Sequence, residues 1–472
     1  MHLVDFLVFG AYFIGILAVG FYFYQKNSTK EDFYVGGRSI SSGHIGLSIA
    51  ATDVGGGFSI GLGGLGFTMG LAGTWLLFTG LLGAWLAAVL TVPRLKQLDM
   101  KHGLFTFPDF LALKYDQRVV AVAALISGIG YLGFTSGQIL AGGKLAAASV
   151  FSGISWMDPL YFSVIVMALV VVLYTVMGGL KAVIYTDTVQ WIVLLSGLMF
   201  LGFPFAYYKL GGWEAIEGAL PATHFSLTNI SPITLVNWSF SIIPIWFIAM
   251  TLYQRVFASP DVKQARRAFF IAGIFEYPML AFVGVGLGAL ARVAFPESDP
   301  ETALPLLLTK VLPIGVGGFV LAAYFSAVMS TADSCLIASS GNFLNDIISK
   351  KLKKKADGSS YSLIRLSQLV TLIIGLLSFL LAGYFTSVLD IVLHSYSFMV
   401  SGLLVPTLMA YFSKFTCSRA AMVSMIGGGG LTLLLIFLDT RLPFGLDATI
   451  FGIAISLVLY ILTYAISRYD DV

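Results

Sequence analysis

Long apolar runs follow one another along almost the whole chain, separated by short polar segments. Thirteen of these runs are close to the roughly 20 residues that an α-helix needs to cross the hydrocarbon core of a bilayer. We therefore predict an all-α polytopic membrane protein with about thirteen transmembrane helices. The expected spans are 4–24, 45–69, 73–93, 119–150, 157–177, 183–208, 232–255, 268–292, 314–346, 363–384, 387–412, 419–438 and 446–467.

Lysine and arginine gather on one side of this arrangement. If the first run enters from outside, 22 of the 27 lysines and arginines fall in or next to inner loops. Cytoplasmic loops of membrane proteins carry such an excess. The pattern predicts an N-terminus outside, a C-terminus in the cytoplasm, and a location in the plasma (inner) membrane. The basic segment 350–360 would then be a cytosolic anchor that follows a span.

Two spans contain residues that disfavour a regular helix at mid-membrane. The second has three glycines and Asp53 within 50–57, and the seventh has two serines and a proline within 239–244. These spans are five apart and cross in opposite directions, and paired interruptions of this kind point to the binding site of an inverted-repeat transporter. We expect one transmembrane domain, made of a leading helix and inner loop (1–44), two five-helix repeats (45–208 and 232–412) and two accessory helices (413–472).

The ninth run is apolar enough for a membrane but rich in hydroxyl side chains, and it also carries Asp333. On a helix, Ala327, Ser330, Thr331 and Ser334 share one face. Hydroxyl, carbonyl and carboxylate oxygens bind hard cations such as Na⁺, and a carboxylate at membrane depth often marks an ion pathway. Small residues of this kind also allow helices to pack closely. The stretch by itself therefore fits an ion site and a packing face equally well.

Composition supports the membrane class and disfavours several others. Of the 472 residues, 58% are apolar and only 11% are charged, which no soluble domain of this size matches. A net charge of +3 does not suggest a nucleic-acid surface, and two cysteines do not suggest a disulfide framework. The G-x-G-x-x-G match at 61–66 follows no strand, so we interpret it as helix packing. The chain has no Walker A or H-E-x-x-H motif, and we expect no enzymatic activity.

Four segments, in order, resemble the sodium:solute symporter family. They are VGGRSI (35–40), GGLKAVIYTDTVQ (178–190), YQRVFASPDVKQARR (253–267) and SAVMSTADSCLIASS (326–340). The resemblance implies the leucine-transporter-like inverted-repeat fold and sodium-coupled uptake of a small organic solute. The run ATDVGGGFSIG is most similar to the choline-transporter branch, which has tryptophan where this chain has Asp53, whereas the proline-transporter branch has aspartate there. An amino acid, a choline-like amine and another zwitterion all remain open as the solute.

The resemblance also implies where Na⁺ binds. Its principal site would use the backbone carbonyls of Ala51, Val54 and Ala327 and the hydroxyls of Ser330 and Thr331, in agreement with the helix face identified above. Some members have a second, more cytosolic sodium site, at positions held here by Asp187, Ser330, Asp333 and Ser334. Because Asp333 replaces a hydroxyl residue of that site, the second site is only a candidate.

The solute would lie at the centre, between the two interrupted helices. Its candidate contacts are Asp53, Gly57, Phe58, Tyr131, Gln138, Phe240, Trp246 and Tyr396. An aspartate with aromatic rings suits an amine or a quaternary ammonium, through charge pairing and a cation–π contact of about 0.5–2 kcal/mol. Lys144, in the outer half of the fourth run, either extends to the outer interface or meets a substrate carboxylate.

We expect Na⁺ to be the coupling ion, binding first from outside, with transport by alternating access. The expected partners are the solute, the sodium ion and the lipid bilayer, without nucleic acid and without an obligatory protein partner. Two alternatives stay open. One is a proton-coupled symporter of the same fold that uses Asp53 or Asp333, and the other is uptake of a sugar or a carboxylate.

Overall fold

The computed structural model describes residues 2–26, 35–348, 360–439 and 442–470, and for a few helical residues it describes the backbone only. Within these ranges every regular element is a helix. The longer ones are α1 (Leu3–Lys26), α3 (Ser42–Met69), α4 (Trp75–Leu90), α5 (Val92–His102), α7 (Gln117–Ala148), α8 (Pro159–Ser196), α11 (Pro232–Ile242), α13 (Val262–Ile274), α14 (Phe282–Ala294), α15 (Pro300–Lys310), α16 (Val316–Gly341), α18 (Ser360–Ala382), α19 (Val388–Phe412), α20 (Ser418–Leu438) and α21 (Ala448–Asp470). The shorter ones are α6 (Phe107–Leu111), α9 (Phe203–Lys209), α10 (Gly212–Ala219) and α12 (Met250–Ala258), with π-helical stretches η3 (Gly197–Gly202), η6 (Phe275–Ala281) and η7 (Asn342–Ile348) and 3₁₀ turns η1 (Gly36–Arg38), η2 (Gly70–Thr74), η4 (Ala222–Phe225), η5 (Pro244–Phe247) and η8 (Pro443–Gly445).

Many of these helices are long and apolar enough to cross a membrane. In the described part of the chain nine spans meet that condition, and a bent pair, Pro232–Ile248 with Met250–Ala258, makes up to ten. Leu3–Val19 and Pro159–Leu173 are apolar but shorter. The predicted all-helical membrane fold is confirmed, whereas the count of thirteen crossings is not. The basic segment 350–360 lies outside the described residues, apart from the backbone of its last residue.

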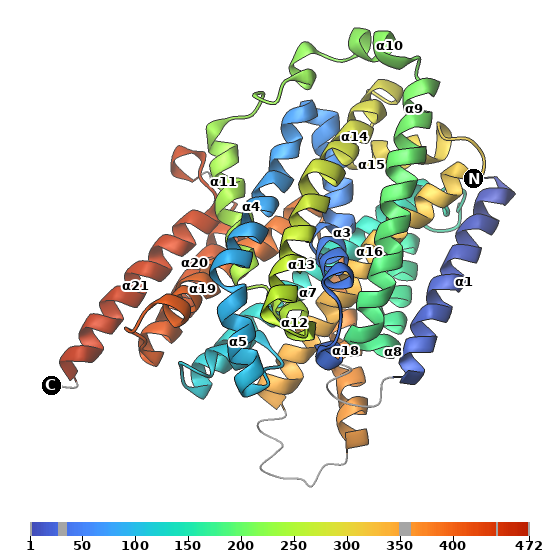
Figure 1. The fold of residues 1–472 in the computed structure, drawn as a ribbon. Coiled ribbons are helices and arrows are strands. Elements are labelled where there is room, and N and C mark those ends of the chain that lie inside the picture. The colour runs from blue at the N-terminus through green and yellow to red at the C-terminus, as the bar shows by residue number, and fades with distance from the viewer. Residues whose placement is uncertain (1, 27–34, 349–359, 440–441, 471–472) are drawn as a thin grey trace.

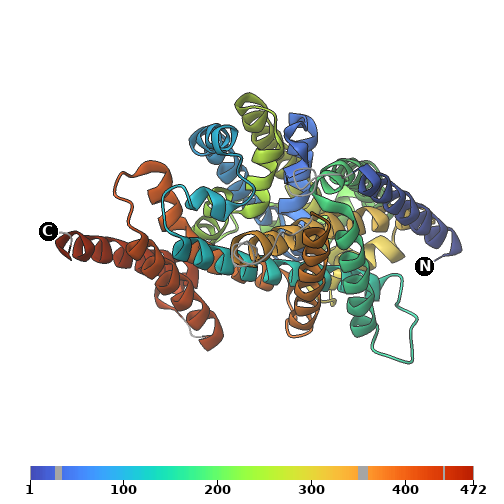
Figure 2. The ribbon, with the colours of Figure 1, turned by 90° about the horizontal axis from the view of Figure 1, so that it is seen from below.

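The central helix of the bundle is α16. Every residue from Val320 to Asn342 is buried, and α16 packs against α3, α7 and α8 (Figure 1). The terminal helices lie on opposite flanks, with α1 at one end and α20 and α21 at the other (Figure 2). A helix enclosed by protein on all sides can carry polar groups that would be costly against lipid. The hydroxyl-rich stretch predicted from the sequence therefore lies in the bundle core.

The interruption predicted in the second span is at Gly55 of α3. Gly55 has φ +48° and ψ −169°, a conformation that only glycine adopts readily. A Cβ atom placed there would lie 2.2 Å from Oγ1 of Thr331 on α16. The sequence needs glycine at this position for two reasons, the turn of the backbone and the close approach of two helices.

The second interruption falls a few residues later than the sequence predicted. Helix α11 continues to Ile242, Pro244 opens the η5 turn, and the chain is extended at Ala249 before α12 begins at Met250. The two segments are bent by 42°. Proline lacks an N–H and is well tolerated in the first turn of a helix, so Pro244 starts a helical turn and the break follows it.

Candidate functional site

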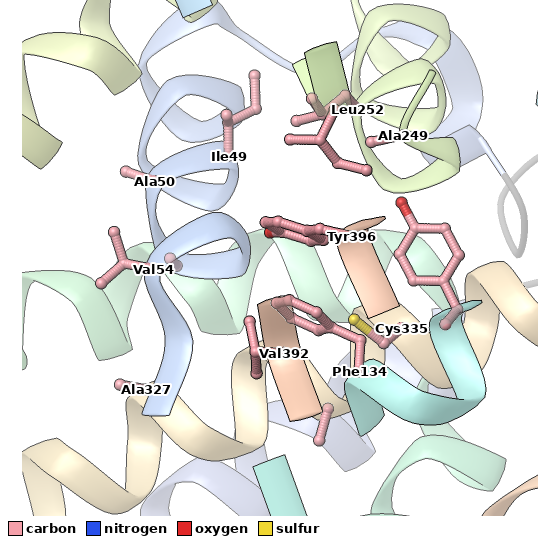
Figure 3. Packing of buried hydrophobic residues seen from close by; sticks show 14 of the residues in the cluster. Ile49, Ala50, Val54, Phe134, Ala249, Leu252, Ala327, Cys335, Val392 and Tyr396 are labelled. Atoms are coloured by element: carbon pink, nitrogen blue, oxygen red, sulfur yellow. The ribbon is translucent and has the colours of Figure 1, made fainter. Parts of the chain in front are cut away.

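The first interruption and the hydroxyl face of α16 are in direct contact. Oγ1 of Thr331 lies 2.9 Å from the carbonyl oxygen of Ala51 and 3.2 Å from that of Ala327. The hydroxyl of Ser330 is buried and has no hydrogen-bond partner among the described residues. Val54 is fully buried one turn beyond Ala51, and Figure 3 shows Ala327 beside the segment of α3 that follows Val54. The structure thus brings together the oxygens of Ala51, Ala327 and Thr331, and it places Ser330 and Val54 next to them.

This group of oxygens has a defined chemical character. Carbonyl and hydroxyl groups are uncharged hard ligands, which suit a hard cation that has lost its water. A hydroxyl has one proton, so Thr331 donates to one carbonyl at a time and leaves the other with a free lone pair. The unpartnered oxygen of Ser330 adds a further acceptor. The arrangement can bind a monovalent cation between α3 and α16.

Two of the predicted solute contacts support the interrupted helices instead. Oε1 of Gln138 accepts a hydrogen bond from the N–H of Gly56 at 2.9 Å. The hydroxyl oxygen of Tyr131 accepts one from the N–H of Thr251 at 3.1 Å. Interruptions of a helix leave backbone N–H groups without their usual acceptors, and a buried unpaired N–H is costly. Both side chains belong to α7, which therefore holds the two breaks at once.

Asp53 and Tyr396 come together as the sequence predicted for a solute site. The hydroxyl of Tyr396 on α19 donates to Oδ1 of Asp53 at 3.2 Å, and Asp53 is only 8% exposed. The Tyr396 ring is stacked on Phe134, with centroids 5.0 Å apart and planes inclined by 12° (Figure 3). A buried carboxylate next to stacked aromatic rings suits a positively charged nitrogen.

Trp246 packs at the side of this region. It is buried in η5, and a Cβ atom on Gly83 of α4 would lie only 2.3 Å from Cδ1 of its indole. Its ring also meets Phe269 edge-on at 5.9 Å. Trp246 therefore closes the space between η5, α4 and α13.

Three predicted solute contacts remain, and one of them is exposed. Phe240 is 45% exposed, whereas its neighbour Ser241 on α11 is buried. A helix turns by 100° per residue, so the inward face of α11 is carried by Ser241 and Ile242. We therefore leave Phe240 out of the site. The side chains of Gly57 and Phe58 lie outside the described residues.

A buried arginine occupies the region of the candidate second sodium site. Arg255 is 0% exposed, and its Nη2 atom lies 2.6 Å from Oγ of Ser334, 2.8 Å from Oγ1 of Thr52 and 3.3 Å from Oδ2 of Asp187. The expected seventh span ended at Arg255, whereas in the structure α12 continues to Ala258 and carries Arg255 into the bundle. A carboxylate in mid-span needs a cation, so Asp187 was the signal that could have revealed this partner.

Asp333 lies apart from this arginine. It accepts a hydrogen bond at 2.7 Å from the hydroxyl of Thr175 on α8. The hydroxyl of Ser330 approaches Asp187 but makes no hydrogen bond with it. The structure therefore groups Asp187 and Ser334 around a guanidinium and gives Asp333 a separate partner.

Lys144 has a third role that sequence analysis did not consider. Its Nζ atom lies 2.6 Å from Oε2 of Glu301 on α15. Glu301 also accepts the N–H of Val388 at 3.1 Å, at the start of α19. Lys144 thus neither extends to the interface nor waits for a substrate carboxylate, and the ion pair ties α7 to α15 and α19.

The buried acid Glu276 was not singled out from the sequence. It lies in η6, where Pro278 falls inside a helical stretch, and it is 0% exposed. A single acid within the apolar run 268–292 was the signal for it.

Comparison with known proteins identifies the family. A model of the sodium:solute symporter family matches residues 33–428. The chain belongs to the sodium:solute symporter family. As a member of this family it is a multi-pass membrane transporter, and Na⁺ is its coupling ion.

Three bacterial proteins are among the curated relatives of this symporter. The high-affinity proline transporter PutP of Bacillus subtilis is 28% identical over 381 residues, covering 78% of each chain. A sodium/proline symporter of Staphylococcus aureus is 28% identical over 396 residues, covering 79% of this chain and 74% of that protein. The osmoregulated proline transporter OpuE of Bacillus subtilis is 26% identical over 97% of this chain and 94% of its own.

Solved structures show the fold of the symporter. A Na⁺-coupled sialic acid symporter in a substrate-bound outward-open state superposes with a TM-score of 0.79 at 20% identity, over 98% of both chains. Mhp1, a nucleobase-cation-symport-1 family transporter, gives 0.61 at 13% identity, over 92% of this chain and 94% of that one. At these identities the likeness shows a shared fold, that of the leucine-transporter-like symporters.

Proposed function

We propose that this symporter imports a small amine-bearing solute, in the first place a proline-like amino acid, together with Na⁺. Two observations support this solute class. Its curated relatives include proline transporters, and the first interruption carries Asp53, the residue type that resemblance to the proline-transporter branch implies. The solute's ammonium would pair with Asp53 and lie against the stacked rings of Tyr396 and Phe134.

The proposed architecture follows the sequence pattern. The chain would cross the membrane thirteen times, with its N-terminus outside and its C-terminus in the cytoplasm. The repeats would cover 45–208 and 232–412, with a leading segment at 1–44 and two accessory helices at 413–472. The interruptions at Gly55 and near Ala249 support this division, since they fall in the first helix of each proposed repeat.

The proposed coupling site is formed by Ala51, Val54, Ala327, Ser330 and Thr331. The observation that carries it is the 2.9 Å approach of the Thr331 hydroxyl to the Ala51 carbonyl across α3 and α16. A sodium ion bound there would join two helices through oxygens on both, and its release would let them separate. One charge moving inward across 100 mV releases roughly 2.3 kcal/mol, and a tenfold sodium gradient adds about 1.4 kcal/mol.

We assign no sodium ion to Asp187, Asp333 and Ser334. The guanidinium of Arg255 already supplies a positive charge to Asp187 and Ser334. A second cation at the same place would face repulsion in a low-dielectric interior. Arg255 is thus proposed as a tethered replacement for the second, cytosolic ion.

The test is uptake of radiolabelled proline into proteoliposomes under a sodium gradient with the pH clamped. Replacing both hydroxyls, Ser330→Ala with Thr331→Ala, should lower sodium-driven uptake at least about tenfold, since a lost contact of about 1.4 kcal/mol changes binding tenfold. The matched control is Ser226→Ala with Thr228→Ala, which removes two hydroxyls from an exposed loop.

Unchanged sodium dependence in the Ser330/Thr331 variant would overturn the coupling site. Uptake driven by a proton gradient without sodium would instead indicate the proton-coupled alternative. Parallel assays with choline, a sugar and a carboxylate in place of proline decide the solute class.

A further inference from the structure

Two buried carboxyl groups face the same point on α4. A Cβ atom built on Gly80 would lie 3.0 Å from Oε2 of Glu276 and 3.9 Å from Oδ2 of Asp53. Apart from the helix's own backbone and chain neighbours, no other heavy atom of the described residues lies within 4 Å of that point. The space in front of Gly80 is therefore bordered by carboxylate oxygens from two different elements, α3 and η6.

Glu276 gives this place its chemical character. Its side chain is 0% exposed, and neither of its carboxyl oxygens has a hydrogen-bond partner among the described residues. Asp53 interacts with it electrostatically. Burying an unpaired carboxylate is expensive, and two of them close together repel each other as well. The pair is stable in its ionised form only with a cation between its members.

Buried and half-buried cations of the described chain serve other groups. Arg255 lies against Asp187, and Lys144 lies against Glu301. Arg292 donates to the carbonyl oxygen of Phe67. A positive charge that keeps Glu276 and Asp53 ionised therefore has to come from a bound ligand, since without one burial favours their protonated, neutral form.

We propose that Asp53 and Glu276 bind a second sodium ion in front of Gly80, separate from the ion between α3 and α16. The close approach of the carboxylates favours an inorganic ion, because a Cβ atom on Gly80 would already lie 3.0 Å from Glu276, which leaves no room for an organic cation. Trp246, which packs against Gly83 one turn further along α4, limits its extent. Carboxylate oxygens are suitable ligands for a hard cation.

Charge balance connects this ion to the solute, and this step rests on the proposed function. The ion at Asp53 and Glu276 and the ion between α3 and α16 together balance the two negative charges of these acids, so the loaded centre has no net charge to offer a further cation. A zwitterion then fits better than a choline-like cation. Occupancy of the second ion would thus select an amino acid over a quaternary amine.

The experiment counts sodium ions on the purified full-length symporter without any solute, by equilibrium binding of ²²Na⁺ at clamped pH. The wild type is expected to bind two ions per chain. Glu276→Gln, which keeps the shape and removes the charge, should bind one. Ser330→Ala with Thr331→Ala should also bind one, and the combination of all three changes should bind none.

Gly80→Ala provides a second variant that leaves both acids in place. Its methyl group would enter the proposed ion position, 3.0 Å from Glu276, and should remove one ion. Gly430→Ala is the matched control, because a Cβ atom on that helical glycine meets nothing within 4 Å. Monodispersity on gel filtration and retention of the sodium ion at the site that was not altered show that each variant is folded.

One ion bound by the wild type, or two retained by Glu276→Gln, would overturn the second site. If the wild type binds one ion and its proline uptake still depends on Na⁺ through Ser330 and Thr331, the proposed function stands without the second ion. If neither ion is bound, both proposals fail.

Discussion

Gly55 shows how a single missing side chain can position an ion site. Its positive φ turns the backbone of α3 and exposes carbonyl oxygens, and its bare Cα lets Thr331 approach them. Any other residue would disturb both features, because a positive φ with ψ near 180° is essentially confined to glycine and costs other residues about 1–3 kcal/mol, and the methyl would collide with Thr331.

Gly55→Ala is therefore expected to lower the free energy of unfolding by about 1–3 kcal/mol or more and to abolish sodium-driven uptake. Thermal unfolding in detergent and uptake in proteoliposomes measure the two effects. Gly64→Ala on the same helix is the control, since its Cβ would meet ordinary contacts at 3.7 Å or more. Equal effects of the two substitutions would show that loss of any α3 glycine is responsible.

Single residues were predictable where their chemistry is local. Asp53 stood out as a charge beside glycines, and Thr331 as a hydroxyl on a repeating face. Arg255 and Glu276 did not stand out, because their partners are more than two hundred residues away in the sequence. Glu276 interacts with Asp53, and Arg255 donates to Ser48 and Thr52. Distances along a chain give no indication of such pairs.

At the scale of elements, α7 braces both interrupted helices. Tyr131 and Gln138 are seven residues apart, two helical turns, and so lie on one face. One of them holds Thr251 after the second break and the other holds Gly56 after the first. A movement of α7 would therefore reach both breaks together.

Tyr131→Phe tests this brace while keeping the ring. It should leave the buried N–H of Thr251 without its acceptor, a loss of about 1–3 kcal/mol in the free energy of unfolding. Tyr384→Phe, at a side chain that is 80% exposed, should change stability little. Chemical denaturation of both variants in the same detergent gives the comparison; equal stability of Tyr131→Phe and the wild type would contradict the bracing role.

Elements were predictable as far as apolar length and helix-breaking residues reveal them. Glycines at 55–57 located the first break, while Pro244 began a turn and moved the second break toward Ala249. The polar helix α5 was not foreseen, because a helix outside the membrane needs no long apolar run.

Across the whole molecule, two ion pairs lie toward opposite ends of α16. Glu301 and Lys144 meet near α15, which precedes its N-terminus, and Arg255 and Asp187 meet beside Ser334 in its C-terminal half. Alternating access requires closures on both sides of a central site. These pairs are placed where such closures would be needed.

Lys144→Met should weaken the closure at the α15 end. The lost hydrogen bond between charged groups corresponds to about 1.5–3 kcal/mol, and hydrogen exchange at the amide of Val388 should become faster. Lys144→Arg retains the pair and should preserve exchange protection and uptake. Protection at Val388 that is identical in all three proteins would show that Glu301 holds α19 without Lys144.

The burial of α16 inside the bundle has a consequence for how the protein is made. This helix is the least apolar of the candidate spans and carries a carboxylate, so lipid is a poor environment for it when it leaves the translocon. Its packing partners α3, α7 and α8 all come earlier in the chain. These three helices are therefore synthesised before α16, which packs against them. A chain in which α16 precedes α3, α7 and α8 should fail at membrane insertion.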